Sequence, residues 1–252
     1  MTLTRINIPA PNARVPFGHQ MRDTQFLFSS SYTPLNHGSF GAYPRPVHDA
    51  HLRYQKMQHE RPSKFIVYDL PDLIDTSRAA VAPLLGCHVD EVVLIPNATT
   101  GINIVLRNLK WDEDGMDTVV YFSTIYPACE KTLISIQELG GNVGSEAVEI
   151  EFPISEDEIV ERFKAGIEHV RRQGKRVRLA MFDTVLTFPG VRMPWERLVG
   201  VCKEEGVLSL IDGAHGIGSS IFPISRSLSL SSASLFHFSS SRNPICDDPD
   251  MI

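Results

Sequence analysis

The sequence predicts an α/β fold with a mainly parallel β-sheet and helices on both of its faces. Short apolar runs alternate with longer segments of helical periodicity between residues 92 and 211. The runs are continuously apolar, as over residues 119–122 (VVYF), which is typical of strands covered on both faces. Several helical segments also begin or end at recognised capping residues. This alternation is the pattern of α/β proteins.

The N-terminal part is less regular. The first 30 residues show no clear periodicity, so we expect an extended N-terminal arm over residues 1–34. A helix is predicted over residues 44–59 and a second over residues 72–85, where Gly86 supplies a stop signal. The apolar positions of the first helix are Val47, Leu52 and Tyr54.

From residue 92 the elements follow one another regularly. Strands are predicted over residues 92–95, 118–122, 147–152, 177–182 and 207–211. Helices are predicted over residues 98–109, 128–139 and 195–205, and a further helix opens at Ser155. Glu158, three residues after Ser155, completes a capping box. The apolar face of this helix is Ile159, Phe163, Ile167 and Val170. The large domain is therefore expected over residues 35–218.

The character of the sequence changes at Ser219. Eleven of the residues from Ser219 to Ser241 are serine, and the chain continues into an acidic stretch over residues 247–250. Low complexity of this kind usually indicates disorder. We expect residues 219–252 to form a disordered or non-native tail.

Composition narrows the classes of function. The net charge of −6 argues against a nucleic-acid binder, and no apolar run approaches the roughly 20 residues of a membrane span. The four cysteines form no C-x-x-C pair, which suits a reducing, cytoplasmic location. His48 and His51 lie three residues apart, but no carboxylate pattern near them completes a metal site. We expect a small-molecule ligand, no nucleic acid, no membrane and no metal.

In an open α/β sheet, ligands bind at the carboxyl ends of the strands, so the residues after each strand are the candidates. Residues 96–101 (PNATTG) follow the first strand and lead into a helix. The free N–H groups at the start of this helix, together with the two threonine hydroxyls, suit an anion. The alternative is that Asn97 simply caps the helix.

Polar or aromatic residues also follow the next strands. Tyr126 follows the predicted strand over residues 118–122. A tyrosine at this position suits stacking on a flat ring or transfer of a proton. The alternative is that it packs in the core. Asp183, Thr184 and Thr187 follow residues 177–182. A hydroxyl in this loop suits a ring oxygen; the alternative is that it takes part in an ordinary turn.

Asp212 ends the last apolar run, and His215 follows it. A carboxylate at the end of a buried strand is costly unless a group pairs with it. A protonated ring nitrogen would pair with it. The alternative is that Asp212 caps the next turn.

Taken in order, these residues resemble the class V aminotransferase family over about residues 35–218, and in particular the isopenicillin N epimerase-like proteins and the fungal hercynylcysteine sulfoxide lyases. The resemblance implies the large domain of a type I pyridoxal-phosphate (PLP) transferase fold, and PLP as cofactor. It implies that Ala98 and Thr99 contact the phosphate and that Asp212 contacts the pyridine nitrogen. The other implied cofactor contacts are Tyr126, which stacks on the ring, and Thr187 and His215, which lie near its phenolic oxygen.

The resemblance also implies chemistry on an amino acid, as a C–S lyase, an epimerase or a transaminase. Asn36, His37 and Gly38 resemble the family's substrate-side loop. Tyr126 is implied as a catalytic residue and favours the lyase, because a phenol can donate a proton to a leaving group.

A lysine that holds PLP covalently follows the aspartate by a few tens of residues in this family. The last lysine here is Lys203, before Asp212. We therefore expect a truncated chain that lacks the small C-terminal domain and is inactive by itself. The alternative is a non-catalytic fragment that binds PLP or a partner. The resemblance implies a homodimer for the full-length fold.

Overall fold

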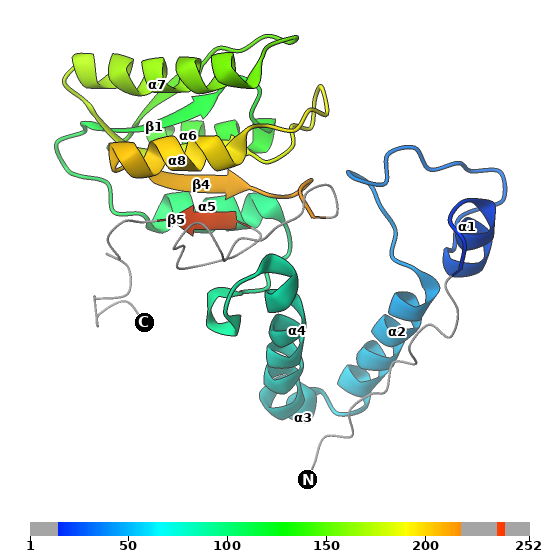
Figure 1. Ribbon diagram of the computed structural model, residues 1–252. Helices are drawn as coiled ribbons and strands as arrows, with labels where there is room; N and C mark the ends of the chain where they lie inside the picture. The colour runs from blue at the N-terminus through cyan, green and yellow to red at the C-terminus, as the bar shows by residue number, and fades with distance from the viewer. Residues whose placement is uncertain (1–14, 218–235, 240–252) are drawn as a thin grey trace. The chain divides into compact units, whose positions relative to one another are not determined.

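The computed structural model describes residues 15–217 and 236–239 (Figure 1). The chain divides into two compact units, Met1–Ile74 and Asp75–Ile252. The domain limits expected from the sequence stay a prediction. No helix within the described ranges is long and apolar enough to cross a membrane. The same residues contain no cluster of three or more histidine, cysteine or acidic side chains that could hold a metal ion.

The first unit is helical. Its elements are α1 (His19–Gln25), α2 (Arg45–Glu60), α3 (Pro62–Lys64), the π-helix η1 (Phe65–Asp69) and the start of α4 (Leu70–Leu85). Helices α2 and α4 confirm two predictions. Helix α1 corrects the expectation of a wholly extended arm. Helix α2 buries none of its residues, and its predicted apolar positions Val47 and Leu52 are half exposed.

The second unit contains a five-stranded sheet of order β2-β1-β3-β4-β5. Its strands are β1 (Asp117–Phe122), β2 (Gly144–Val148), β3 (Arg176–Asp183), β4 (Leu208–Asp212) and β5 (Phe236–Ser239). The first four strands are parallel, and β5 pairs antiparallel with β4. The prediction of a mainly parallel sheet is confirmed.

Helices cover both faces of this sheet, as predicted. They are α5 (Ala98–Asn108), α6 (Pro127–Glu138), α7 (Glu156–Arg172) and α8 (Trp195–Glu205), and a 3-10 turn, η2 (Val89–Glu91), precedes them. Apolar residues of α5 and α6 share one buried cluster with one face of the sheet. Residues of α7 and α8 share a second cluster with the opposite face.

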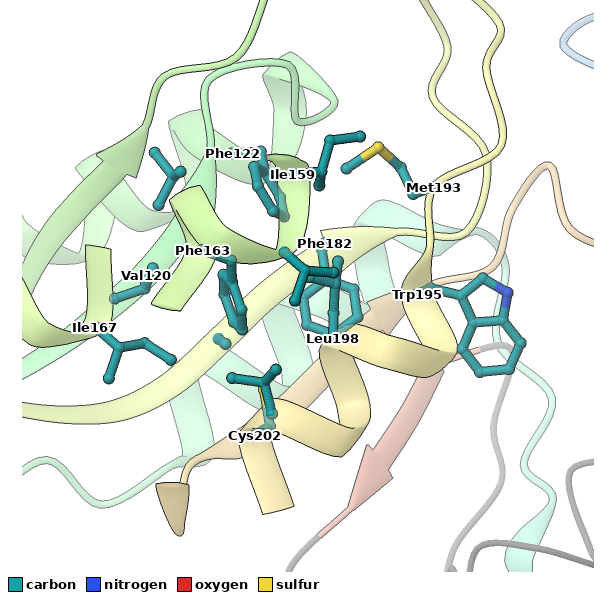
Figure 2. Packing of buried hydrophobic residues seen from close by; sticks show 14 of the residues in the cluster. Val120, Phe122, Ile159, Phe163, Ile167, Phe182, Met193, Trp195, Leu198 and Cys202 are labelled. Atoms are coloured by element: carbon teal, nitrogen blue, oxygen red, sulfur yellow. The ribbon is translucent and has the colours of Figure 1, made fainter. Parts of the chain in front are cut away.

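Phe163 of α7 lies in the middle of the second cluster (Figure 2). Its ring stacks on Phe122 of β1, with centroids 5.7 Å apart, and meets Phe182 of β3 edge-on at 5.9 Å. Leu198 and Cys202 of α8 close the cluster from the other helix. The aromatic contacts therefore hold α7 against two neighbouring strands.

Local capping signals act at two helices, and the cap at Ser155 confirms a prediction. The Ser155 hydroxyl accepts a hydrogen bond from the N–H of Glu158 at 3.1 Å and so caps α7. The Glu158 carboxylate binds the guanidinium of Arg162, in place of the reciprocal half of the predicted capping box. Gly206 ends α8 with φ at 66°, a left-handed conformation that favours glycine.

Two predicted strands differ from the structure. Residues 92–95 belong to no described strand, and Val93 and Leu94 are about half exposed. The predicted strand over residues 147–152 instead spans Gly144–Val148. It ends where its partner ends, because Val148 is the register partner of Phe122. Most of the predicted tail, residues 219–252, lies outside the described residues, although four of them form β5, so the expectation of disorder does not hold for these four.

Candidate active site

Two aspartates lie side by side at the carboxyl edge of the sheet. Asp183 ends β3, Asp212 ends β4, and the two are register partners. Side chains alternate between the faces of a strand. Met181 and Leu210, two residues earlier, belong to the cluster beneath α5 and α6. Both aspartates therefore project toward the α5–α6 face, on strands about 4.8 Å apart.

Asp212 is 4% exposed, and its carboxylate contacts Ala214 and Cys129. Its Oδ1 accepts a hydrogen bond from the N–H of Ala214 at 2.9 Å. Its Oδ2 lies 3.7 Å from the thiol of Cys129, a weak donor from α6. Burial raises the pKa of Asp212, while the Ala214 N–H, the Cys129 thiol and nearby His215 oppose that rise. Asp212 therefore caps the turn after β4 through its hydrogen bond from Ala214, as the alternative predicted. Its Oδ2 can still accept a hydrogen bond from a donor stronger than the thiol.

Two further residues, Asp183 and Cys129, lie at this site without a role predicted from the sequence. Asp183 is 5% exposed, and burial, followed by the charge of Asp212, raises its pKa to about 8. Burial and the same two carboxylates raise the pKa of the Cys129 thiol. In the sequence, Asp183 follows a buried apolar run just as Asp212 does, and this position could have identified it as a candidate site residue. The contact of Cys129 with Asp212 spans 83 positions and depends on the fold.

Tyr126 is the N-cap residue of α6, and Cys129 follows it by one turn. The side chain of Tyr126 is 42% exposed, which excludes packing in the core. Because Cys129 touches Asp212, the first turn of α6 lies against the carboxyl end of β4. Tyr126 therefore lies at the same edge of the sheet as the two aspartates.

Helix α5 runs beside α6 in the same direction. Asn103 contacts Thr132, and one turn later Arg107 contacts Ser135. The N-terminus of α5, with Ala98 and Thr99, is therefore level with the N-terminus of α6. The first turn of α5 therefore presents its free N–H groups at this edge. Helix α6 begins with Pro127, which has no N–H.

Asn97 caps α5, as the alternative interpretation of this segment predicted. Its Oδ1 accepts hydrogen bonds from the N–H of Thr100 at 2.8 Å and from the Thr100 hydroxyl at 3.0 Å. Capping and anion binding are compatible, because the cap uses the Thr100 N–H and leaves the N–H groups of the preceding residues to a ligand.

The loops after β3 and β4 hold the remaining candidates of this unit. Thr187 is exposed in the loop between β3 and α8. The threonine that contacts the site is Thr184, whose N–H donates to the Asp212 carbonyl at 2.9 Å and whose hydroxyl donates to it at 3.3 Å. His215 is partly buried three residues after Asp212.

The predicted substrate-side residues Asn36, His37 and Gly38 belong to the first unit and are exposed. The Asn36 carbonyl accepts a hydrogen bond from the N–H of Phe40 at 2.9 Å, which closes a turn. The His37 ring packs edge-on against Phe26, with centroids 5.7 Å apart. Their role stays a prediction.

Comparison with known proteins identifies the family. Residues 46–227 match the family described as aminotransferase class-V. The chain belongs to this family. The match spans all of the edge residues described above, from Ala98 to His215, so the sequence resemblance is confirmed.

The chain is also similar to individual proteins that bear names of lyases and desulfhydrases. The chain is 36% identical over 205 residues to the L-cysteine desulfhydrase-like protein lolT1 of Epichloe uncinata, covering 81% of this chain and 44% of that protein. It is 36% identical to the L-cysteine desulfhydrase of Arabidopsis thaliana, covering 73% and 42%. It is 28% identical to the hercynylcysteine sulfoxide lyase of Schizosaccharomyces pombe, covering 80% and 49%. The chain thus spans about half the length of these relatives.

The fold also matches solved structures. A complex of the cystine C-S lyase C-DES with cysteine persulfide superimposes with a TM-score of 0.60 at 20% identity, covering 76% of this chain and 50% of that one. This likeness confirms the type I PLP-transferase fold. PLP is therefore the cofactor of the class V family to which the chain belongs.

The residues at the carboxyl edge fit this cofactor. Asp212 offers a buried carboxylate oxygen whose described partner is a weak thiol donor, which suits a protonated ring nitrogen. The first turn of α5 offers N–H groups to a phosphate. Exposed Tyr126 offers a ring to stack on. The assignment of Ala98, Thr99, Tyr126, Thr187, Asp212 and His215 to individual cofactor contacts stays a prediction.

Proposed function

We propose that the protein containing this chain is a PLP-dependent C–S lyase that acts on a sulfur-containing amino acid. The observation that carries the proposal is that the buried Asp212 carboxylate and the exposed Tyr126 side chain lie at the same edge of the sheet. Relatives at 36% identity bear the name cysteine desulfhydrase, while isopenicillin N epimerase is 26% identical. These values favour lyase chemistry over epimerase chemistry.

Bound PLP supplies an electron sink for the substrate's α-carbon. The chain's own residues serve this chemistry in three ways. Asp212 keeps a proton on the ring nitrogen, the first turn of α5 binds the phosphate, and Tyr126 donates a proton to the departing sulfur. The proton on the α-carbon requires a base. Residues 204–252 contain no lysine, so we propose that the chain by itself lacks both this base and the covalent link to PLP.

The reaction is tested by joining residues 1–218 to the C-terminal half of the Epichloe uncinata protein lolT1. We expect this completed enzyme to release sulfide and pyruvate from L-cysteine, and the 252-residue chain to release neither. Products are measured by sulfide trapping and by a coupled pyruvate assay. Racemised or transaminated cysteine as the main product would overturn the lyase proposal, and sulfide release by the unextended chain would overturn the proposed lack of a base.

The exposed apolar side chains of the first unit bear on how the protein assembles. We propose that the first unit pairs with a second copy of the protein, since it exposes many large apolar side chains. Those at least half exposed are Phe17, Leu27, Tyr32, Leu35, Phe40, Leu52, Ile66, Val67 and Tyr68. Exposed apolar surface beyond a few hundred Å² usually marks an interface. This surface also favours the alternative of a non-catalytic, partner-binding fragment.

The exposed apolar surface predicts concentration-dependent association. Sedimentation equilibrium of the chain should show dimers whose share falls on dilution. Changing Val67 and Tyr68 to serine should shift the chain to monomer, because both side chains are 60% or more exposed and contribute little to the core. A matched pair of changes in the second unit, Leu139 and Phe188 to serine, should leave the association constant unchanged. A strictly monomeric unaltered chain would contradict the proposal.

A further inference from the structure

The carboxyl edge holds two buried acids where PLP chemistry uses one. Asp183 and Asp212 are register partners on adjacent parallel strands, project to the same face and are each no more than 5% exposed. Among the residues whose side chains are described, the other titratable groups that interact with them are the Cys129 thiol from α6 and the His215 ring from the loop after β4. The role proposed above for Asp212 leaves Asp183 without a function.

Two carboxylates this close in a poorly solvated site do not both ionise readily, because each desolvated charge also repels the other. The surroundings decide which one keeps the proton. Asp212 accepts hydrogen bonds from the Ala214 N–H and from Cys129, and His215 lies nearby, all of which favour its ionised form. At Asp183, burial and the charge of Asp212 both favour the protonated form, opposed by a hydrogen bond from its own backbone.

We propose that Asp183 and Asp212 form a carboxyl pair in which Asp183 holds a proton at neutral pH and leaves Asp212 ionised toward the cofactor's ring nitrogen. Asp183 is then a positioning residue that acts through Asp212. The inference rests on the proposed role of Asp212 toward PLP, and it does not depend on the lyase reaction.

The pair predicts a pH-dependent stability that an isosteric change removes. The pKa of Asp183 is about 8 in the folded chain and about 3.9 in an unfolded one, so folding retains a proton between these values. The contribution of Asp183 to stability is complete below pH of about 4 and is lost as the pH rises toward 8. Asp183→Asn removes this loss. Its midpoint of urea unfolding, relative to that of the unaltered chain, should therefore rise from pH 5 to about pH 8 and then level off.

The control is Asp157→Asn, at an aspartate whose side chain is 86% exposed and whose partner Arg197 keeps its charge over this pH range, so the difference in midpoint should stay flat. A flat difference for Asp183→Asn overturns the inference. If that variant fails to fold, infrared spectroscopy of the unaltered chain decides the matter. A protonated-carboxyl band that persists at pH 7 and disappears above about pH 8 supports the pair, and its absence at pH 7 overturns it.

PLP binding by the same chains tests the action on Asp212. When the pH rises through about 8, Asp183 ionises and adds a negative charge beside the protonated ring, whereas the uncharged amide of the Asp183→Asn variant cannot ionise. The ratio of PLP affinities, unaltered chain to Asp183→Asn, should therefore rise several-fold between pH 6 and 9. A ratio of PLP affinities that stays constant with pH would overturn the positioning role of Asp183. If the unfolding profile were as expected, the two aspartates would still form a carboxyl pair, but one that does not affect the cofactor ring. If the unaltered chain does not bind PLP, the ratio is measured in the protein completed with the C-terminal half of lolT1. Failure of that completed protein to bind PLP would overturn the role of Asp212 on which the inference rests, whatever the fate of the lyase proposal.

Discussion

Asp212→Asn is expected to lower the turnover of the completed enzyme by on the order of 10²–10³-fold, the usual loss when a buried electrostatic stabiliser is removed. The carboxylate is 4% exposed, so water cannot replace it at the ring nitrogen. Asparagine has nearly the same shape but no charge, and it does not favour a protonated ring. Because the burial of Asp212 raises its pKa, the change should leave the fold intact or stabilise it slightly at neutral pH.

The measurement is steady-state sulfide release by the protein completed with the C-terminal half of lolT1. Circular dichroism and the urea midpoint establish that the variant is folded. Asp90→Asn is the matched control and should retain full activity, because Asp90 is an exposed residue of the 3-10 turn before α5. Rates within a few-fold of the unaltered enzyme would show that Asp212 is not the partner of the ring nitrogen.

Leu198→Ala is expected to reduce the free energy of unfolding of the second unit by about 3–5 kcal/mol, as for other fully buried leucines. Leu198 is completely buried in the cluster between α8 and the sheet, close to Phe163 and Phe182 (Figure 2). The change removes apolar surface and leaves a cavity that close-packed rings do not readily fill.

Urea unfolding followed by tryptophan fluorescence measures this loss, since Trp195 lies in the same helix. The control is Leu139→Ala at the end of α6, where the side chain is 77% exposed and the expected change is within about 0.5 kcal/mol. Equal effects of the two substitutions would mean that α8 is not packed as described.

The sequence by itself determined the fold class and most of the elements of the second unit. Helix α8 has the predicted limits, and α5 and α6 lie within one residue of theirs. These segments are long, strongly periodic and bounded by local signals such as Asn97, the cap of α5, whose effect depends only on neighbouring residues. The sequence also placed Asp212 and Tyr126 after their strands, which suffices to bring them to one edge in a parallel sheet.

Strand limits depended on the tertiary structure, because a strand is defined by its partner. Residues 92–95 are as apolar as the true strands but pair with no described strand. The edge strand β2 ends at Val148, where β1 ends at Phe122, although the apolar pattern continues to residue 152. Hydrogen-bond partners many residues away set these limits, and no local pattern contains them.

The relation between the two aspartates also depends on the tertiary structure. The sequence shows that each follows a buried strand. Only the register of β3 against β4 makes them neighbours, and only the packing of α6 brings the Cys129 thiol to Asp212 and leaves Tyr126 exposed. The charge of a carboxyl group in a protein depends on its burial and on the charges around it. The tertiary structure therefore decided which acid is held ionised and which is held protonated.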